Sequence, residues 1–445
     1  MANNREELVD QFIAFSGQGK VQSAIGVAQP NSDIDTRDKC TITREEVVTR
    51  RDVRDCKNQD LVDSQLVTRL ARYTLVYEEV TPQIMARWFA WFAGGSAAAS
   101  GTPADEAQTL TRGGTVSGGT FRINMTLEGR TVQTKDIAWD ASTAAIQAAL
   151  TTSRMFFIHS GDVVVTGTWG TAMTLTFGNR LGNANLPAVT ITNNLTGSSP
   201  VINVAQATPG DQNFHAFSRA ASRIKKRFSF VKGFEANTGS IEKFADYVCE
   251  SFLPTSSLTA DPGLTVTILG PWEPDSLEPA YTVPDCVNPD PLRSEDCKLE
   301  VNNAFQTQDL VSLTNNLNDN VPIDRLSAFE YDGSEVQALI RGKQPTYNST
   351  ASVFGIYDAA VYILAQNEKT QDPVEIVQHY GLPGNRFSLI YPNAKVRFQT
   401  NRDEFVGTAE TSAIKLEFVP LVDGVDAPID GEAYLDQTAQ FLVSS

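Results

Sequence analysis

One segment of this chain differs so sharply from its flanks that it constrains every possible fold. From Thr102 to Gly210 the sequence is rich in Thr, Gly, Ala and Asn and contains almost no Lys or Glu. Flexible joints, GGSAAASGTPAD and QATPGDQN, border this segment, and charged amphipathic patterns resume on both sides. We therefore expect one domain inserted into another, with the function of the scaffold lying outside the insertion.

Length and composition indicate a folded protein of several domains. The 445 residues exceed what one hydrophobic core usually organises, and 41% of them are hydrophobic. No apolar run reaches the ~20 residues that span a bilayer, and the N-terminus lacks the apolar core of a signal peptide. We expect synthesis in a cytoplasm and no membrane insertion.

The chain is acidic, with 53 Asp and Glu against 36 Lys and Arg and a formal net charge of −17. This balance argues against tight nucleic-acid binding, because that affinity depends on Lys and Arg displacing counterions from phosphate. An acidic wall past which DNA slides without sticking fits the charge. A generally soluble acidic protein fits it equally well.

The five cysteines indicate neither a zinc site nor a disulfide framework, since their number is odd and no C-x-x-C spacing occurs. Reduced structural thiols are the simpler interpretation. Pairing of Cys286 with Cys297, or of Cys40 with Cys56, stays open if the protein meets an oxidising exterior.

The first scaffold region is expected to hold a charged arm, a strand and a helix. Asn31 to Val67 mixes both charge signs, which fits a solvated helix or a long ordered arm. The run TRLARYTLVYEEV that follows alternates β-forming residues and predicts a strand. A helix should begin at Pro82 after the N-cap Thr81 and end at Gly94 or Gly95. One broad apolar face of this helix, which we expect to pack on a sheet, consists of Ile84, Met85, Trp88, Phe89 and Phe92.

The insertion should form a small α+β module. Its pattern predicts a hairpin about Gly129, a helix begun by Asp140 or Ser142, and further strands. After the insertion, SIEKFADYVCESF is expected as a helix or a helix–strand junction, and GLTVTILGPW as a strand.

The last third of the chain repeats the element order of the first scaffold region. A Pro-rich bridge leads to an extended segment, a polar arm, the strand TASVFGIYD and a helix AAVYILAQNEK with Asp358 as its N-cap. Four further strands follow. The order of elements is shared but the residues are not, so we expect a duplication of the scaffold domain.

These patterns predict a mainly β fold with few helices (α+β), built from two β-sandwich or half-barrel domains and the inserted α+β module. The expected boundaries are 1–101 with 211–275 for a discontinuous first domain, 102–210 for the insertion, 276–307 for a Pro-rich linker and 308–445 for the second domain.

No grouping of residues suggests catalysis. His159, His215 and His379 lack a partner at metal-ligand spacing, and nucleophile-elbow, phosphate-loop and dinucleotide motifs are missing from the sequence. The run RIKKRF is a weak nucleic-acid signal and is better explained by salt bridges at an interface. We therefore expect no enzyme and no catalytic, cofactor or metal site.

The run YTLVYEEVTPQIMARWFAWFAGG, followed later by FSFVKGFEANTGSIEKFADYVCESFLPTSSLTADPGLTVTILGPWEP, resembles the major tail tube proteins of long-tailed bacteriophages (siphoviruses). The segment GGTFRINMTLEGRTVQTKDIAWDASTAAIQAAL resembles modules added to phage virion proteins. The resemblance covers most of the chain. It implies that sheets of neighbouring subunits join edge to edge into a closed inner β-barrel, with helices outside and long loops bridging stacked rings.

The resemblance also implies a location and partners. The location is the virion tail, and the tube would let DNA pass. The partners are copies of the chain itself, the tape measure protein, the tail terminator and baseplate components. Tube proteins with one such domain form six-subunit rings, so two domains in one chain imply homotrimeric rings. The arms Asn31 to Gln65 and Asn318 to Gln344 would contact the adjacent ring, with these candidate contact residues: Arg44, Glu45, Glu46, Arg50, Arg51, Asp52, Arg54, Asp55, Asp324 and Arg325.

Two other classes of virion protein remain open. The Thr- and Asn-rich strands of the insertion are also typical of carbohydrate- or receptor-binding modules. Another tail ring component, such as a terminator or a distal tail protein, would use the same scaffold. A cell-wall hydrolase is least favoured, because acid, base and nucleophile residues do not cluster in the sequence.

Overall fold

The computed structural model confirms a mainly β fold, with two α-helices in the part of the chain that it describes. Neither helix is long and apolar enough to cross a bilayer. The described residues are 11–16, 31–34, 40–54, 61–94, 104–127, 130–152, 155, 158–211, 213–218, 225–234, 237–257, 259–272, 274, 276–277, 291–302, 304–305, 310–321, 345–354, 370, 372–383, 385–398, 413–421 and 430–435.

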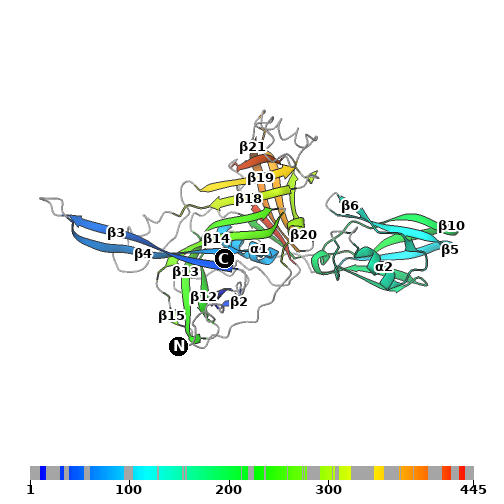
Figure 1. Ribbon diagram of the computed structural model, residues 1–445, viewed down its shortest axis with the longest axis horizontal. Helices are drawn as coiled ribbons and strands as arrows, with labels where there is room; N and C mark the ends of the chain where they lie inside the picture. The colour runs from blue at the N-terminus through cyan, green and yellow to red at the C-terminus, as the bar shows by residue number, and fades with distance from the viewer. Residues whose placement is uncertain are drawn as a thin grey trace.

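A large antiparallel sheet forms the scaffold (Figure 1). Its first region contains five strands that pair in the order β3–β4–β14–β13–β12. Their bounds are β3 Cys40–Arg54, β4 Leu61–Tyr77, β14 Ala260–Pro271, β13 Asn237–Ser257 and β12 Phe228–Phe234. Short flanking strands extend this region: β1 Gln11–Ser16, β2 Asn31–Ile34 and β15 Ser276–Leu277.

The last third of the chain repeats this pairing pattern with β18–β19–β22–β21–β20. Their bounds are β18 Leu310–Asn318, β19 Thr346–Phe354, β22 Ala413–Pro420, β21 Asn385–Phe398 and β20 Val374–Leu382. The strands that flank them are β11 Asn213–Ser218, β16 Cys297–Val301, β17 Ala304–Phe305 and β23 Asp430–Leu435. The helix expected after Asp358 lies outside the described residues.

The two repeats are joined through their backbones. The second half of β13 turns away from β12 and pairs with β18, from Ser251 opposite Asn318 to Ser257 opposite Ser312. As a result, β3, β4, β14, β13, β18, β19, β22 and β21 follow one another as eight neighbouring strands, four from each repeat.

The expected helix in 240–252 was wrong, because this segment lies within β13. Glu242, Lys243 and Ala245 are good helix formers, but helix propensity is a small energy that tertiary pairing overrides. β13 is central in the sheet, with β12, β14, β15 and β18 as hydrogen-bonded neighbours. Pairing on both sides satisfies its backbone, and Phe244, Tyr247 and Phe252 are fully buried.

Helix α1 (Pro82–Ala93) was predicted correctly and lies over the sheet. The Thr81 side chain accepts a hydrogen bond from the N–H of Ile84 at 3.3 Å, and Pro82 opens the first turn. Gly94 ends the helix in the left-handed conformation (φ 78°), which a residue with a Cβ adopts only with strain. Trp88 and Trp91 are completely buried, and Trp91 stacks on Phe228 at 4.2 Å between ring centroids.

One continuous core lies beneath both repeats. Phe89 of α1 contacts Phe252 of the first repeat and Phe387 of the second, with ring centroids 5.5 Å apart in both pairs. The same cluster of buried residues extends from Ala71 to Phe418. The two scaffold regions therefore share their packing, and their division into separate domains stays a prediction.

The insertion has its own sheet, with strand order β10–β5–β9–β8, and its own apolar core. Its elements are β5 Ala107–Leu127, β6 Arg130–Gln133, β7 Ile137–Ala138, α2 Thr143–Leu150, β8 Val163–Thr168, β9 Ala172–Phe177 and β10 Thr190–Thr208. The expected hairpin is formed by β5 and β6, and Ser142, rather than Asp140, caps α2 by accepting from the N–H of Ala145.

A buried ion pair holds the two repeats together beside the β13–β18 ladder. The ammonium of Lys225 bonds to the carboxylate of Asp319 and donates to the Phe92 carbonyl at the end of α1 at 2.7 Å. Tyr347 donates to the other oxygen of Asp319. Both charged side chains are less than 5% exposed. Lys225 belongs to the RIKKRF run, for which we expected salt bridges at an interface; this pair is instead buried within the chain.

We predict that Lys225→Met destabilises the protein by roughly 3 to 5 kcal/mol, since it leaves the Asp319 carboxylate buried without its cation. Lys225→Met combined with Asp319→Asn should cost less than the single change, because no charge is then stranded. Denaturant unfolding followed by tryptophan fluorescence measures both variants. A single variant that loses under about 1 kcal/mol would contradict this account.

Candidate assembly surfaces

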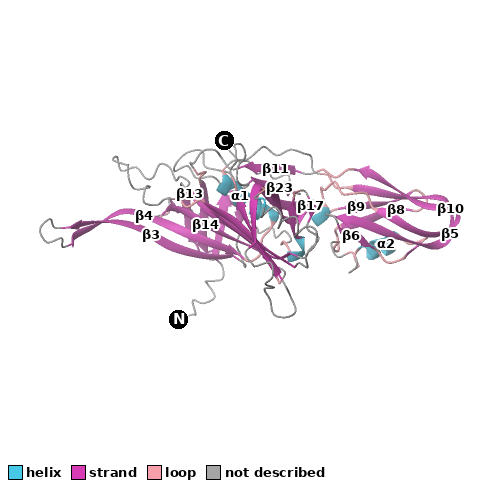
Figure 2. Cartoon of the chain, turned by 90° about the horizontal axis from the view of Figure 1, so that it is seen from above, coloured by secondary structure: helices cyan, strands magenta, loops and turns pink. Residues whose placement is uncertain are grey.

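The hairpin of β3 and β4 extends beyond the sheet as a two-stranded ribbon. β14 supports β4 only along Leu70 to Tyr77. Farther out, Leu61 to Thr68 of β4 pair with β3 and with no other strand of the described residues. Figures 1 and 2 show this ribbon projecting from one end of the molecule, so the charged segment is an arm and not a solvated helix. We call residues 48–69 the arm.

The base of the arm is fixed by an arginine stacked between aromatic rings. The Arg44 guanidinium lies 3.8 Å from the Trp272 ring centroid and 5.4 Å from that of Tyr73, and it donates to the Trp272 carbonyl. Burial is the main cause that raises the pKa of Tyr73 to about 12, so its hydroxyl stays neutral. Arg44 therefore anchors the hairpin to the sheet, and its contact with a neighbouring ring of subunits stays a prediction.

Charged residues also pair on the opposite face of β3 and β4. Arg72 donates to both carboxylate oxygens of Glu250 at 2.9 and 3.3 Å, and Glu45 lies 3.8 Å from Arg72. The Glu250 side chain is 8% exposed whereas that of Glu45 is 67% exposed. The Arg72–Glu250 pair is consequently structural, and Glu45 has most of its surface available.

The structure separates the ten predicted ring-contact residues into three groups. Arg44, Glu45 and Glu46 lie at the base of the arm, where β14 supports the sheet. Arg50, Arg51, Asp52 and Arg54 belong to the arm part of β3. Asp55, Asp324 and Arg325 lie outside the described residues.

The insertion leaves the scaffold at the end opposite to the arm (Figures 1 and 2). Two backbone hydrogen bonds between Ala104 and Asp211, of 3.0 and 2.9 Å, close its neck. The His159 ring lies 3.1 Å from the Glu295 carboxylate of the scaffold, and Leu382 of β20 packs into the core of the insertion. These few contacts make the insertion a projection attached to the scaffold at one side.

Sequence reasoning missed a buried serine–histidine–glutamate network. His379 of β20 contacts the Ser388 hydroxyl with Nδ1 and the Glu300 carboxylate with Nε2, each at 2.9 Å. The residue types are those of an acyl-transfer triad, but a nucleophile must be reachable by its substrate. Ser388 is 1% exposed, and His379 is 4% exposed. The arrangement therefore joins neighbouring strands and offers no path to a substrate. No spacing in the sequence predicts this network, because the three strands that carry these residues come together only in the folded sheet.

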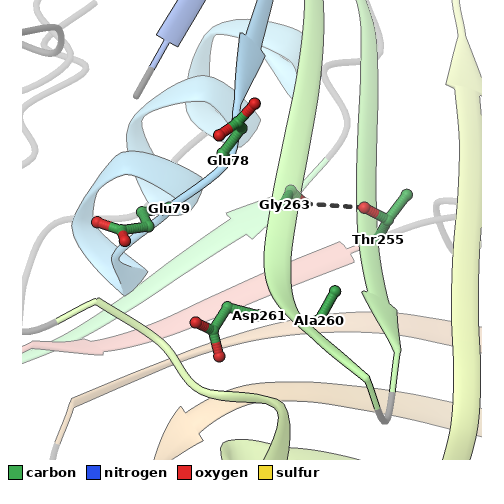
Figure 3. Close-up of a pocket in the computed structure, with 6 residues that line it drawn as sticks. All are labelled: Glu78, Glu79, Thr255, Ala260, Asp261 and Gly263. Carbon is green, nitrogen blue, oxygen red and sulfur yellow. Dashed lines mark hydrogen bonds between the residues drawn. The ribbon is translucent and has the colours of Figure 1, made fainter. Parts of the chain in front are cut away.

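A surface pocket of about 390 Å³ lies between β4, β13 and β14 (Figure 3). Its lining includes Glu78, Glu79 and Asp261, whose carboxylates point in different directions, and Thr255, which donates to the Gly263 carbonyl at 3.4 Å. In the described part of the chain, His, Cys, Asp and Glu do not gather in groups suited to a metal ion. The pocket presents acidic surface without a nucleophile and base in contact.

The remaining histidine and the described thiols are buried. His215 of β11 is 1% exposed and stacks beside Phe217, and burial lowers its pKa. Cys249 and Cys297 are free, and burial raises the pKa of each to about 12. Both thiols are therefore unreactive. Cys286 and Cys56 lie outside the described residues, so the two pairings left open by the sequence stay untested.

No protein-family model matches the sequence, and no curated protein matches it as a relative. The geometry of the strand edges and of the arm is thus the basis for a functional interpretation.

We predict that acid destabilises the protein partly through His379. Burial is the main cause that lowers its pKa from 6.5 to about 4, so folding favours the neutral ring. This stabilisation is complete above pH 6.5 and is lost as the pH falls toward 4. The hydrogen bond from His379 lowers the pKa of Glu300, whose contribution is also lost in acid. His379→Gln should flatten the fall in unfolding midpoint between pH 6.5 and 4. An equal slope in this variant and in the unchanged protein would exclude this role.

Proposed function

We propose that this chain is a structural virion protein that assembles into stacked rings and forms the hollow tube of a siphovirus tail. The observation that carries this proposal is the run of eight neighbouring strands, four from each of two topologically equal repeats. Two units of the same topology, joined side by side by main-chain hydrogen bonds, would supply one segment of a ring. Further copies continue the sheet if its end strands pair in the same way.

The end strands support ring closure. On its outer side β3 has no partner strand among the described residues, and β21 loses β20 as a neighbour after Ala394. Open edges of this length invite pairing with another chain, and a closed ring removes them. Three copies of an eight-stranded unit would supply the strands of a barrel wide enough to hold a channel.

The arm fits a role along the axis of the tube. The insertion fits a role on the outer surface of the tube. A two-stranded ribbon that leaves the sheet along its strand direction is placed to reach a neighbouring ring. The insertion contacts the scaffold through a closed neck and a few side chains, so it would decorate the outer surface. The net charge of −17 favours a wall that does not retain DNA.

We predict that purified protein forms long hollow rods in negative-stain electron micrographs. Rods are expected because ring closure satisfies the sheet edges and the arms join successive rings. Closed single rings would instead indicate a terminator or another ring component. Compact particles without a central channel would contradict the proposal.

We predict that removal of the arm separates ring formation from stacking. Replacing residues 50–67 by Asn-Gly joins Thr49 to Thr68, which face each other in the hairpin, through a tight turn. This variant should form rings but no rods, because the part of β3 that lies against the sheet is kept. The matched control deletes residues 102–210 with a short linker and should still form rods. Rods in the first variant, or their loss in the control, would contradict the assigned roles.

A further inference from the structure

The internal joint between the repeats shows where a second copy would bind. In the first repeat, the last residue of β13 that pairs with β12 is Tyr247, opposite Phe228, and β18 takes the same side of β13 from Ser251 onward. In the second repeat, the last residue of β21 that pairs with β20 is Ala394, opposite Val374. Beyond Ala394 this side of β21 has no partner strand in the described part of the chain.

The pairing registers allow rows of opposite residues to be matched between the two repeats, although β13 has a register shift between Cys249 and Ser251 that β21 lacks. Phe252 lies opposite Val266, and Val266 lies opposite Leu75. In the second repeat, Phe398 lies opposite Leu416, and Leu416 lies opposite Ala351. The inner residues of both rows are buried. The match is supported by the last residues that pair with β12 and β20, since Tyr247 and Ala394 lie equally far from Phe252 and Phe398 once the register shift in β13 is counted.

The next strand in each row completes the correspondence. Leu75 lies opposite Ile42 of β3, and Ala351 lies opposite Leu313 of β18. β3 and β18 are therefore equivalent strands, one at the open end of the sheet and the other at the internal joint. In this correspondence Asn318 of β18 matches Val47 of β3, and Ser251 of β13 matches Arg397 of β21.

We infer that the end of β21 binds the outer edge of β3 of a second copy, in the register that β13 and β18 use within one chain. Ser251 faces Asn318 at the internal joint, so Arg397 of one copy faces Val47 of the next. The partner of each edge strand, β3 or β21, is thus another copy of this chain. This inference rests on the proposed function and specifies the contact that closes the ring.

Charge complementarity favours this pairing. Arg397 is exposed, and Lys395 is two residues before it on β21. Glu45 is two residues from Val47 on the same face of β3, and its side chain is 67% exposed. Diagonal neighbours across two strands are ~7 to 8 Å apart, which a long arginine side chain spans. Arg397 of one copy therefore meets Glu45 of the next.

The junction between copies is more polar than the internal joint, as one pair of matched positions shows. Leu317 of β18 faces Phe252 and is fully buried. Its equivalent on β3 is Glu46, which would face Phe398. A carboxylate here makes the contact between copies less apolar than the joint within a chain, which is consistent with a chain that folds before it assembles.

A disulfide between copies tests the register. In Val47→Cys combined with Arg397→Cys, the two positions are separated within one chain by seven strand spacings, on the order of 30 Å. A bond between them can therefore form only between copies. After mild oxidation of assembled protein, non-reducing electrophoresis should show covalent dimers and trimers, no larger species, and reversal by thiol. The two single variants and Thr43→Cys with Arg397→Cys are controls that should stay monomeric.

The outcomes distinguish the proposed contact between copies from the proposed tube function. Hollow rods without the cross-link, or with an equal cross-link at Thr43, would overturn the junction and leave the tube proposal standing. Cross-linked trimers that never stack would support the junction and contradict the tube. Monomers without cross-link would contradict both.

Charge exchange gives a second measurement that needs no cysteine. Glu45→Arg and Arg397→Glu should each abolish assembly as measured by sedimentation. The double variant should restore it, since the opposite charges meet again. Assembly that is unchanged in both single variants, or not recovered in the double variant, would contradict the predicted contact.

Discussion

The backbone ladder between β13 and β18 is the interaction on which the rest of the structure depends. It turns two separate antiparallel units into one sheet, and it brings Phe252 and Phe387 against the same helix. The buried Lys225–Asp319 pair lies beside it and links the segment before β12 to the end of β18. Without this ladder each repeat would expose a strand edge at the centre of the molecule.

The same ladder explains why the chain would assemble. A sheet made of two units with the same strand order has two end strands, β3 and the part of β21 beyond Ala394, that each lack a neighbour on one side in the described part of the chain. Hydrogen-bonding groups at such ends are satisfied by another chain or by closure. The arm and the insertion leave from opposite ends of the molecule, so neither needs to obstruct the contact through which copies would pair.

Local patterns were sufficient to predict much of the fold, and pairing between distant strands was not. Thr81, Pro82 and Gly94 defined α1 because caps and proline act within a few residues. The helix expected within 240–252 was wrong because four neighbouring strands decide the conformation of β13. The arm was recognised from mixed charge, yet its hairpin form was left open. The contact of His379 with Glu300 and Ser388 depends on three strands, so no sequence spacing indicates it.

The count of copies around the channel tests the central claim most directly. Top views of the assembled particles, averaged in two dimensions, should show a central hole, an inner wall with six similar units, and three outer projections from the insertions. This account predicts three copies because each chain supplies two units of the wall. Six projections around the hole, or particles without a hole, would contradict it.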